Sequence, residues 1–150
     1  MRDVLTRRQF LSSSGVLLVS PFIALRHASA AAPTLRLTAI ELLPVRATSR
    51  TVWLVVRLRT DAGLTGLGEA SDAFGFASTT AANAETMRTR LQSFFELVRG
   101  SSPLDVERYR QRGMPMVKGD LVAATAFSAI EQAMWDLAGQ ALGKGDRCGG

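Results

Sequence analysis

The last long apolar stretch of the chain, residues 122–143, constrains the fold more than any other segment. Large apolar side chains recur there every three to five residues, close to one face of a helix, at Phe127, Ile130, Met134, Leu137 and Leu142. Small residues between them would let a second element approach closely, at Ala126, Ala129, Ala133 and Gly139. Asp120 is placed to cap the start of the helix and Gly143 to end it. We therefore predict a buried helix with packing partners on more than one side.

Three apolar segments earlier in the chain predict an antiparallel sheet. Residues 35–45 form the first strand, and a change in the phase of its apolar residues near Ala39 indicates a bulge or two covered faces. Residues 51–60 alternate between two sets of side chains, as is typical of a strand. Residues 61–63 predict a tight turn, and residues 64–70 return as a third strand, so the last two strands form a hairpin.

Two further helices are predicted between the third strand and the long helix. The first carries an apolar stripe that ends at Gly100 and consists of Met87, Leu91, Phe94, Phe95 and Val98. The second opens with Ser102 as its N-cap and Pro103 at its first position, and Gly113 and Pro115 end it. A three-stranded meander followed by about three helices is an α+β domain.

Length, charge and composition exclude several classes of protein. The 150 residues suffice for one domain with a modest core. The net charge is +5, of which the first thirty residues supply +3, and the remainder has no basic run, so we expect no nucleic acid partner. The single Cys148 cannot form an internal disulfide. The single His27 lies in a segment that we expect to be removed, which excludes Ser-His and Cys-His pairs and histidine zinc sites.

The first thirty residues have the composition of an export signal. A basic start is followed by an apolar run at residues 10–25 and by small residues that predict cleavage after Ala30. An uncleaved membrane anchor is the alternative. Its most apolar part, residues 16–25, is interrupted by Ser20 and Pro21 and is much shorter than the roughly 20 residues that span a bilayer, so we expect no stable anchor.

This segment also resembles a bacterial twin-arginine (Tat) signal. Arg7 and Arg8 stand in the sequence Thr-Arg-Arg-Gln-Phe-Leu, which is similar to the motif that the Tat translocase reads. Residues 1–30 are therefore predicted to be a Tat signal and residues 31–34 a linker. The resemblance implies a bacterial protein that is periplasmic or secreted.

Two patterns that suggest chemistry are better explained by structure. Residues 66–68 fail as a dinucleotide-binding loop, because the third glycine position holds Ser71 and the preceding strand belongs to an antiparallel hairpin. Glu69, Glu131 and Asp136 are candidate acids, but the last two lie more than a third of a turn apart on the long helix. We interpret these acids as capping or ion-pairing groups rather than a catalytic pair.

The sequence resembles the enolase superfamily in two long motifs. Residues 57–70 read Arg-Leu-Arg-Thr-Asp-Ala-Gly-Leu-Thr-Gly-Leu-Gly-Glu-Ala. Residues 128–143 read Ser-Ala-Ile-Glu-Gln-Ala-Met-Trp-Asp-Leu-Ala-Gly-Gln-Ala-Leu-Gly. Together these motifs are similar to the N-terminal capping domain of the mandelate racemase/muconate lactonizing enzyme group. The resemblance covers residues 37–143, and we expect the domain to occupy residues 35–143.

The resemblance implies a chemistry for the full-length protein. In that group the domain covers the mouth of a (β/α) barrel, whose carboxylates bind Mg²⁺ and whose Lys or His base removes a proton α to a carboxylate. The full-length protein would then be a racemase, a cycloisomerase or an acid-sugar dehydratase acting on a small carboxylate-containing molecule. Members of the group are often homo-oligomers.

Two loops of such a domain would close over the substrate, residues 45–50 and residues 71–76. The candidate substrate-capping residues are Arg46, Arg50, Asp72, Phe74 and Phe76. The arginines would pair with the carboxylate of the substrate, and the phenylalanines would supply apolar contacts. The sequence leaves open the alternative that both phenylalanines fold back onto their own domain.

The chain departs from the family pattern at its C-terminal end. A barrel needs about 200 residues or more, and residues 144–150 lack the proline and the Leu-Leu-Gly-Gly ending that are usual in the family. We therefore expect a fragment, or a prematurely ended reading frame, in which the barrel is absent. Such a chain would hold no catalytic residue and no metal ligand, and would bind no Mg²⁺. The alternative is a stand-alone periplasmic binding or interaction module without catalysis.

Overall fold

The computed structural model describes residues 34–48, 51–74 and 80–143, apart from the side chain of Asp72. Every described residue lies in the second of the two units into which the chain divides, Ala31–Gly150. The predicted signal, with Arg7 and Arg8, therefore lies outside the described residues, as does the tail at residues 144–150.

The sheet is the predicted antiparallel meander. Its strands are β1 (Leu37–Arg46), β2 (Val52–Thr60) and β3 (Thr65–Glu69), in the order β1-β2-β3. The pairing of β1 with β2 shifts register between Leu37 and Ala39, which confirms the predicted bulge. Gly63, with a φ of +80°, makes the turn between β2 and β3.

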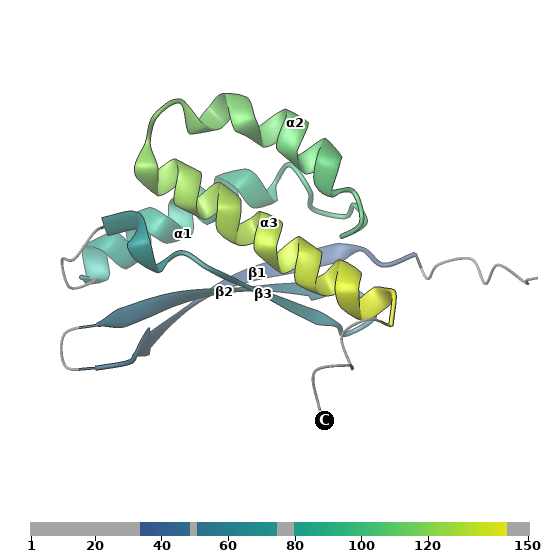
Figure 1. Cartoon of the computed structure of the whole chain (residues 1–150), viewed down its shortest axis with the longest axis horizontal. Coiled ribbons are helices and arrows are strands. Elements are labelled where there is room, and N and C mark those ends of the chain that lie inside the picture. Colours follow the sequence, from purple (N-terminus) through teal and green to yellow (C-terminus); the bar gives the residue numbers. More distant parts are fainter. Residues whose placement is uncertain (1–33, 49–50, 75–79, 144–150) are drawn as a thin grey trace, which may run out of the picture. The chain divides into compact units, whose positions relative to one another are not determined.

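The central strand β2 supplies most of the fully buried side chains of the sheet. Leu54, Val56 and Leu58 are fully buried, whereas Trp53 on the opposite face is 51% exposed. The helices cover one face of the sheet, and no described element covers the other (Figure 1). This arrangement explains why the alternation in β2 is so regular, since only one of its two faces packs against helices.

Within the described residues, four helical elements follow the sheet: the 3₁₀ helix η2 (Ser71–Phe74), α1 (Ala81–Phe95), α2 (Val106–Val117) and α3 (Leu121–Ala141). The five residues of the predicted stripe are all buried, but α1 ends at Phe95, so Val98 lies in the turn that leads to Gly100 (φ +75°). No helix among the described residues has both the length and the apolar character needed to cross a membrane. The α+β fold class predicted from the sequence is thus confirmed.

The long helix α3 begins where the sequence predicts. The carboxylate of Asp120 accepts hydrogen bonds from the backbone N–H groups of Val122 (2.9 Å) and Ala123 (3.2 Å). Gly143 lies just beyond the helix with a φ of +66°, as expected for a glycine that ends it. Leu142 was expected on the buried face, but it is 61% exposed. It is the C-cap residue, and five positions after the last large core residue turn the helix by about 140° away from the core.

The start of α2 differs from the prediction. Its N-cap is Asp105, not Ser102, and its first residue is Val106. Ser102 instead stabilises a preceding turn, because its hydroxyl oxygen accepts from the N–H of Leu104 (3.2 Å). Pro103 lies in that turn. The Ser-Pro pair therefore marks a turn that precedes α2, not the start of the helix. Hydroxyl side chains cap short turns as readily as helices, so the two cannot be told apart from the residue types alone.

The end of α2 was also predicted too early. The helix continues through Gly113 and Pro115 to Val117, and ends at Lys118, whose φ is +34°. A side chain at Gly113 would lie 2.5 Å from the ring of Phe127, so glycine is needed there for packing rather than for a helix end. Packing against α3 overrides the low helix propensity of Gly113, whereas Pro115 is exposed and no contact among the described residues explains why the helix continues through it.

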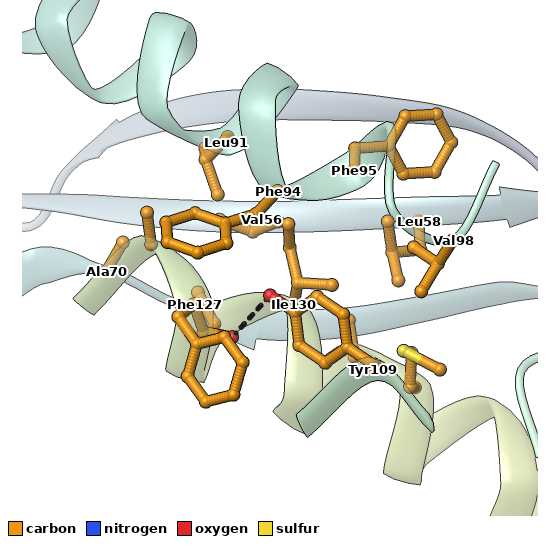
Figure 2. Packing of buried hydrophobic residues seen from close by; sticks show 14 of the residues in the cluster. Val56, Leu58, Ala70, Leu91, Phe94, Phe95, Val98, Tyr109, Phe127 and Ile130 are labelled. Atoms are coloured by element: carbon orange, nitrogen blue, oxygen red, sulfur yellow. Dashed lines mark hydrogen bonds between the residues drawn. The ribbon is translucent and has the colours of Figure 1, made fainter. Parts of the chain in front are cut away.

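The centre of the core is an aromatic cluster between α1, α2 and α3 (Figure 2). The ring of Tyr109 stacks on Phe127 at 4.7 Å, and Phe94 meets the same ring edge-on at 5.7 Å. The buried Tyr109 hydroxyl donates to the backbone carbonyl of Phe127 (3.0 Å), so its polar atom is satisfied. Burial, and then the charge of Glu131, raises the pKa of Tyr109. The cluster fixes α2 against α3.

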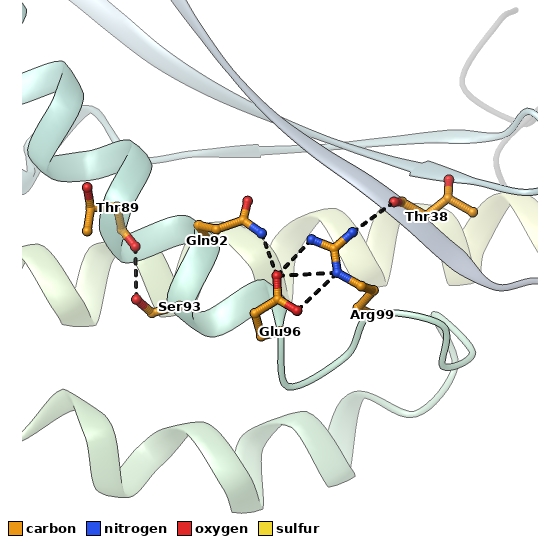
Figure 3. Close-up of polar contacts among 6 residues, drawn as sticks. All are labelled: Thr38, Thr89, Gln92, Ser93, Glu96 and Arg99. Carbon is orange, nitrogen blue, oxygen red and sulfur yellow. Dashed lines mark hydrogen bonds and ion pairs between the residues drawn. The ribbon is translucent and has the colours of Figure 1, made fainter.

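A polar network ties the end of α1 to the sheet (Figure 3). The carboxylate of Glu96 accepts from Arg99 (2.7 Å) and from Gln92, and these two hydrogen bonds, in that order, lower the pKa of Glu96. The guanidinium of Arg99 also lies 4.7 Å above the ring of Phe95 and donates to the carbonyl of Thr38 in β1. These contacts hold α1 beside β1 at the edge of the sheet.

Candidate functional site

The outer edge of β3 is closed by three side chains of α3. Gln132 accepts a hydrogen bond from the N–H of Glu69 (3.1 Å) and Asp136 accepts from that of Leu67 (2.9 Å), while Gln140 donates to the carbonyl of Thr65 (2.8 Å). Four residues of a helix advance about 6 Å and two residues of a strand about 6.7 Å, so the two sets of groups stay in step. We call Gln132, Asp136 and Gln140 the edge ladder. It pairs three of the backbone groups on the edge of β3 that lies beside α3, and so covers part of an otherwise open strand edge.

Two glycines of β3 allow α3 to lie this close. A methyl group at Gly68 would lie 2.0 Å from the carbonyl oxygen of Ala129, and one at Gly66 would lie 2.2 Å from that of Ala133. These are the close approaches that the small residues of the long helix led us to expect. The two glycines of the Gly-Leu-Gly pattern therefore allow close packing against α3. This agrees with our prediction that the pattern is not a dinucleotide-binding loop.

The exit from β3 is held against β2. The N–H of Ala70 donates to the carbonyl of Leu54 (2.8 Å), and the N–H of Leu54 donates to the hydroxyl of Ser71 (3.0 Å). These two bonds fix the start of η2 beside the first residues of β2. The hydroxyl of Ser71 thus accepts from the backbone N–H of Leu54, for which the short strand β3 offers no carbonyl partner.

Arg46 lies at the same end of the sheet as η2. It is the last residue of β1 and pairs with Val52, two positions before Leu54 on β2. Because β1 and β3 flank β2, their backbones lie about 10 Å apart at this end. Arg46 is exposed, and among the described residues no hydrogen bond or ion pair holds its guanidinium. We call Arg46 and η2 the capping end of the domain.

The other predicted capping residues are placed only in part. Asp72 belongs to the backbone of η2, while Arg50 and Phe76 lie outside the described residues. Phe74 is half-buried and packs against the core, which agrees with the alternative in which it folds back onto its own domain. Its contact with a substrate remains a prediction.

A shallow hollow of about 330 Å³ lies beside the capping end, between the end of β3 and the first half of α3. It is lined by Glu69, Ser71, Ala124, Thr125, Ser128 and Gln132. The carboxylate of Glu69 has no hydrogen-bond or ion-pair partner among the described residues. Sequence reasoning missed this hollow because its residues come from segments more than fifty positions apart, with no shared motif to link them.

The remaining acids behave as the sequence predicts. Glu131 lies 3.8 Å from Arg110 on α2, and Asp136 belongs to the edge ladder. On the open face of the sheet, the hydrogen bonds from Arg57 and then from Arg59 lower the pKa of Glu41. The described part of the chain contains no group of three or more His, Cys, Asp or Glu side chains arranged to hold a metal ion.

The three-stranded meander, the three helices and the glycine-dependent contact of β3 with α3 define an enolase-type N-terminal domain. The family model for the mandelate racemase/muconate lactonizing enzyme N-terminal domain matches residues 32–145. The chain belongs to this family.

Individual relatives agree with this assignment. The chain is 27% identical over 96 residues to a D-galactonate dehydratase of Variovorax paradoxus (strain S110), a match that covers 61% of this chain and 22% of the relative. Among solved structures, a mandelate racemase/muconate lactonizing enzyme from Jannaschia sp. CCS1 is 30% identical with a TM-score of 0.58, covering 71% of this chain and 28% of that one. Another from Sulfitobacter sp. is 27% identical with a TM-score of 0.57, covering 71% and 27%. The chain thus spans about a quarter of the length of these relatives.

Proposed function

We propose that this domain caps the substrate site of an enzyme that removes a proton α to a carboxylate. Membership in the family supports this proposal, together with the likeness to a relative named D-galactonate dehydratase. The substrate would be a small carboxylate-containing molecule such as an acid sugar. The reaction would be a dehydration, a racemisation or a cycloisomerisation.

The observation that carries the proposal is the capping end itself. Arg46 ends β1 and η2 follows β3. The register of the sheet and the hydrogen bonds to Leu54 nevertheless bring them to the same end of the sheet. An exposed guanidinium without a partner among the described residues is suited to a carboxylate, which it binds through paired charge-assisted hydrogen bonds. Arg46 would therefore bind and orient the acid group of the substrate.

The neighbouring segments would exclude water from that site. Residues 45–50 and 71–76 would close over the substrate, with Arg50 and Asp72 as polar contacts and Phe74 and Phe76 as apolar ones. Excluding water strengthens the electrostatic interactions of the bound carboxylate with its partners. The described residues do not form a cluster that fits Mg²⁺, so the metal and the proton-abstracting base would belong to the larger part of the relatives that this chain does not match. In such enzymes the metal stabilises the negative charge that develops on the carboxylate.

A domain exchange tests the proposal. Residues 35–143 would replace the N-terminal domain of the Variovorax paradoxus relative, and dehydration of D-galactonate would be measured with and without Arg46→Met. We expect Arg46→Met to raise KM about tenfold or more, with a smaller change in kcat, because a charge-assisted hydrogen bond to the substrate is lost. Arg108→Met is the matched control, since Arg108 is exposed on α2 and makes only a 3.8 Å ion pair with Asp105. If a cooperatively folding exchange protein showed equal KM values for all three forms, Arg46 would not face the substrate.

We also propose that the Tat translocase exports the protein to the periplasm or beyond. The support is the similarity of residues 6–11 to the twin-arginine motif. Replacing both Arg7 and Arg8 by lysine should retain the protein in the cytoplasm of a bacterial host, with residues 1–30 still attached. Export of the doubly substituted protein at the normal rate would contradict this proposal.

A further inference from the structure

The hollow beside the capping end has a lining unlike that of most small-molecule sites. Its volume of about 330 Å³ suits a small molecule, but such sites are usually lined by aromatic and aliphatic side chains. The described residues around this hollow instead carry three hydroxyl groups, one amide and one carboxylate, and only Ala124 is apolar. A molecule that fits the hollow is therefore polar over most of its surface.

Two serine hydroxyls of the hollow still have a proton to donate. The hydroxyl of Ser71 accepts from the N–H of Leu54 (3.0 Å). The hydroxyl of Ser128 accepts from the amide of Gln132 (3.4 Å). Neither hydroxyl donates to an acceptor among the described residues. Each offers a free donor to a ligand, because a hydroxyl can donate and accept at the same time.

Two other groups of the hollow are free to accept. The hydroxyl of Thr125 spends its proton on the carbonyl of Leu121 (2.8 Å), which leaves its lone pairs for a ligand. The carboxylate of Glu69 has no hydrogen-bond or ion-pair partner within the described part of the chain. Free donors and free acceptors thus lie side by side, and this mixture suits alcohol groups, each of which both donates and accepts.

The charge of the hollow decides which part of a substrate it takes. Glu69 is its one charged residue, so the hollow repels the acid group of a substrate. The acid group instead matches Arg46, whose guanidinium is exposed at the same end of the sheet. The two sites therefore suit opposite ends of a molecule that has a carboxylate at one end and hydroxyl groups at the other.

We propose that the hollow is a subsite for the hydroxyl-bearing end of a polyhydroxy acid, with Ser71, Ser128, Thr125 and Glu69 as its hydrogen-bonding groups. This inference rests on the proposed function, and it narrows the substrate of that function to an acid sugar. An aromatic or hydrocarbon acid would leave these polar groups without partners once water is excluded, which is costly.

The spacing of the two sites fits a molecule of this kind. Arg46 pairs with Val52 and Glu69 pairs with Val55, from the two outer strands of the sheet. Three residues along the strands and two strand spacings separate the Cα atoms of Arg46 and Glu69 by about 14 Å. The extended side chain of Arg46 and an open-chain acid of about six carbons can together span this distance.

A second polypeptide segment would fit the hollow less well than a polyol. The buried centre of a protein interface is apolar and depleted of charged residues. The hollow has a carboxylate and no large apolar side chain among its described lining residues. The exposed Trp135 and Leu142 of α3 suit a polypeptide contact better, and neither of them lines the hollow.

Amide chemical shifts of the purified, isotope-labelled chain, titrated with three probes, test the inference. Galactitol has only hydroxyl groups, hexanoate has only an acid group, and D-galactonate has both. We expect galactitol and D-galactonate to shift the amides of Glu69, Thr125 and Ser128, with dissociation constants in about the millimolar range. Hexanoate should shift only amides near Arg46. Added salt should weaken the binding of hexanoate but not that of galactitol.

Two variants make the test specific to the hollow. Ser128→Ala removes one donor and should weaken galactitol binding by about threefold to tenfold, without changing the hexanoate response. Ser93→Ala is the matched control, because Ser93 also lies on a helix and is exposed, but it belongs to α1 and should leave all three titrations unchanged. Ala124→Leu fills the hollow without removing a polar group and should abolish the galactitol response, while a thermal melt reports that the domain still folds.

The three probes separate a failure of this inference from a failure of the proposed function. Absence of a galactitol response in the hollow, or a response that Ser128→Ala and Ala124→Leu both leave unchanged, would overturn the subsite. The role of Arg46 would still stand if hexanoate shifted the amides around it. If hexanoate caused no shift there while galactitol still bound the hollow, the role of Arg46 would fail and the hydroxyl subsite would be supported.

Discussion

The substitution Gly68→Ala tests the packing of β3 under α3 most sharply. Gly68 has an ordinary φ, so alanine at this position meets no backbone strain and would by itself stabilise a strand by about 0.5–1 kcal/mol. The added methyl group would, however, lie 2.0 Å from the carbonyl oxygen of Ala129 and 2.9 Å from its carbon. The contact is with helix backbone rather than with a flexible side chain. The packing therefore decides the sign of the effect.

The magnitude follows from the displacement that the overlap requires. Restoring an ordinary contact of 3.4 Å means moving α3 away from β3 by about 1.4 Å, which also stretches the bonds of the edge ladder. Overpacking of this kind costs about 1–3 kcal/mol or more. After subtracting the gain for alanine, we expect a net loss of about 1–2 kcal/mol, or a fall in Tm of about 5–10 °C.

Urea or thermal unfolding followed by circular dichroism measures this loss. Gly139→Ala is the control, because its methyl group meets nothing within 4 Å, and it should raise the stability by up to about 1 kcal/mol. The two glycine substitutions should thus act in opposite directions. A Gly68→Ala protein as stable as the wild type would refute the close contact of β3 with α3.

Three further outcomes follow from the hydrogen bonds of the domain. Tyr109→Phe should cost about 1 kcal/mol in urea unfolding, because the buried hydroxyl no longer bonds the carbonyl of Phe127; an unchanged midpoint would exclude this bond. Asp136→Ala should cost about 1–3 kcal/mol and increase amide hydrogen exchange at Leu67, whose N–H loses its acceptor. The pKa of Glu41 is lowered from its ordinary value of 4.5, so its stabilising effect is complete above that pH and is lost as pH falls through the lowered pKa. The Tm difference between wild type and Glu41→Gln should accordingly be small but present at pH 7 and should shrink below about pH 4.5, and a constant difference would contradict the ion pairs.

Periodic patterns in the sequence predicted most of the fold. The alternation in β2 and the apolar spacing of α3 reflect burial on one face, and burial is what the structure shows for Leu54, Val56 and Ile130. The capping of α3 by Asp120 is equally local, since donor and acceptor lie within three residues of each other. Features of this kind depend on neighbours in sequence and are visible without a structure.

The bounds of α2 could not be found in this way. Gly113 and Pro115 are helix-breaking residues by propensity, yet α2 continues through both. At Gly113 the sequence does not show that Phe127, from another helix, packs where a side chain would stand. The edge ladder was missed for the same reason. Gln132 and Gln140 look like ordinary surface residues until the edge of β3 is placed beside them.

The candidate site was predicted least completely. Arg46 was singled out from its position in a loop, and the structure adds that η2 lies at the same end of the sheet. The hollow, and the exposure of Trp135 and Leu142, depend on which elements pack together in the folded domain, and the sequence does not show this. The residue type alone does not tell whether an apolar side chain lies inside or outside the core.

Reading the genomic DNA downstream of codon 150 is the most direct test of the proposed capping role. We expect this DNA to encode, in the same or a shifted frame, a segment similar to the larger part of the Variovorax paradoxus relative, which this chain does not match. That segment should carry carboxylates at the ends of successive strands, as expected for a Mg²⁺ site. Unrelated sequence in every frame would contradict the capping role and favour a stand-alone binding module.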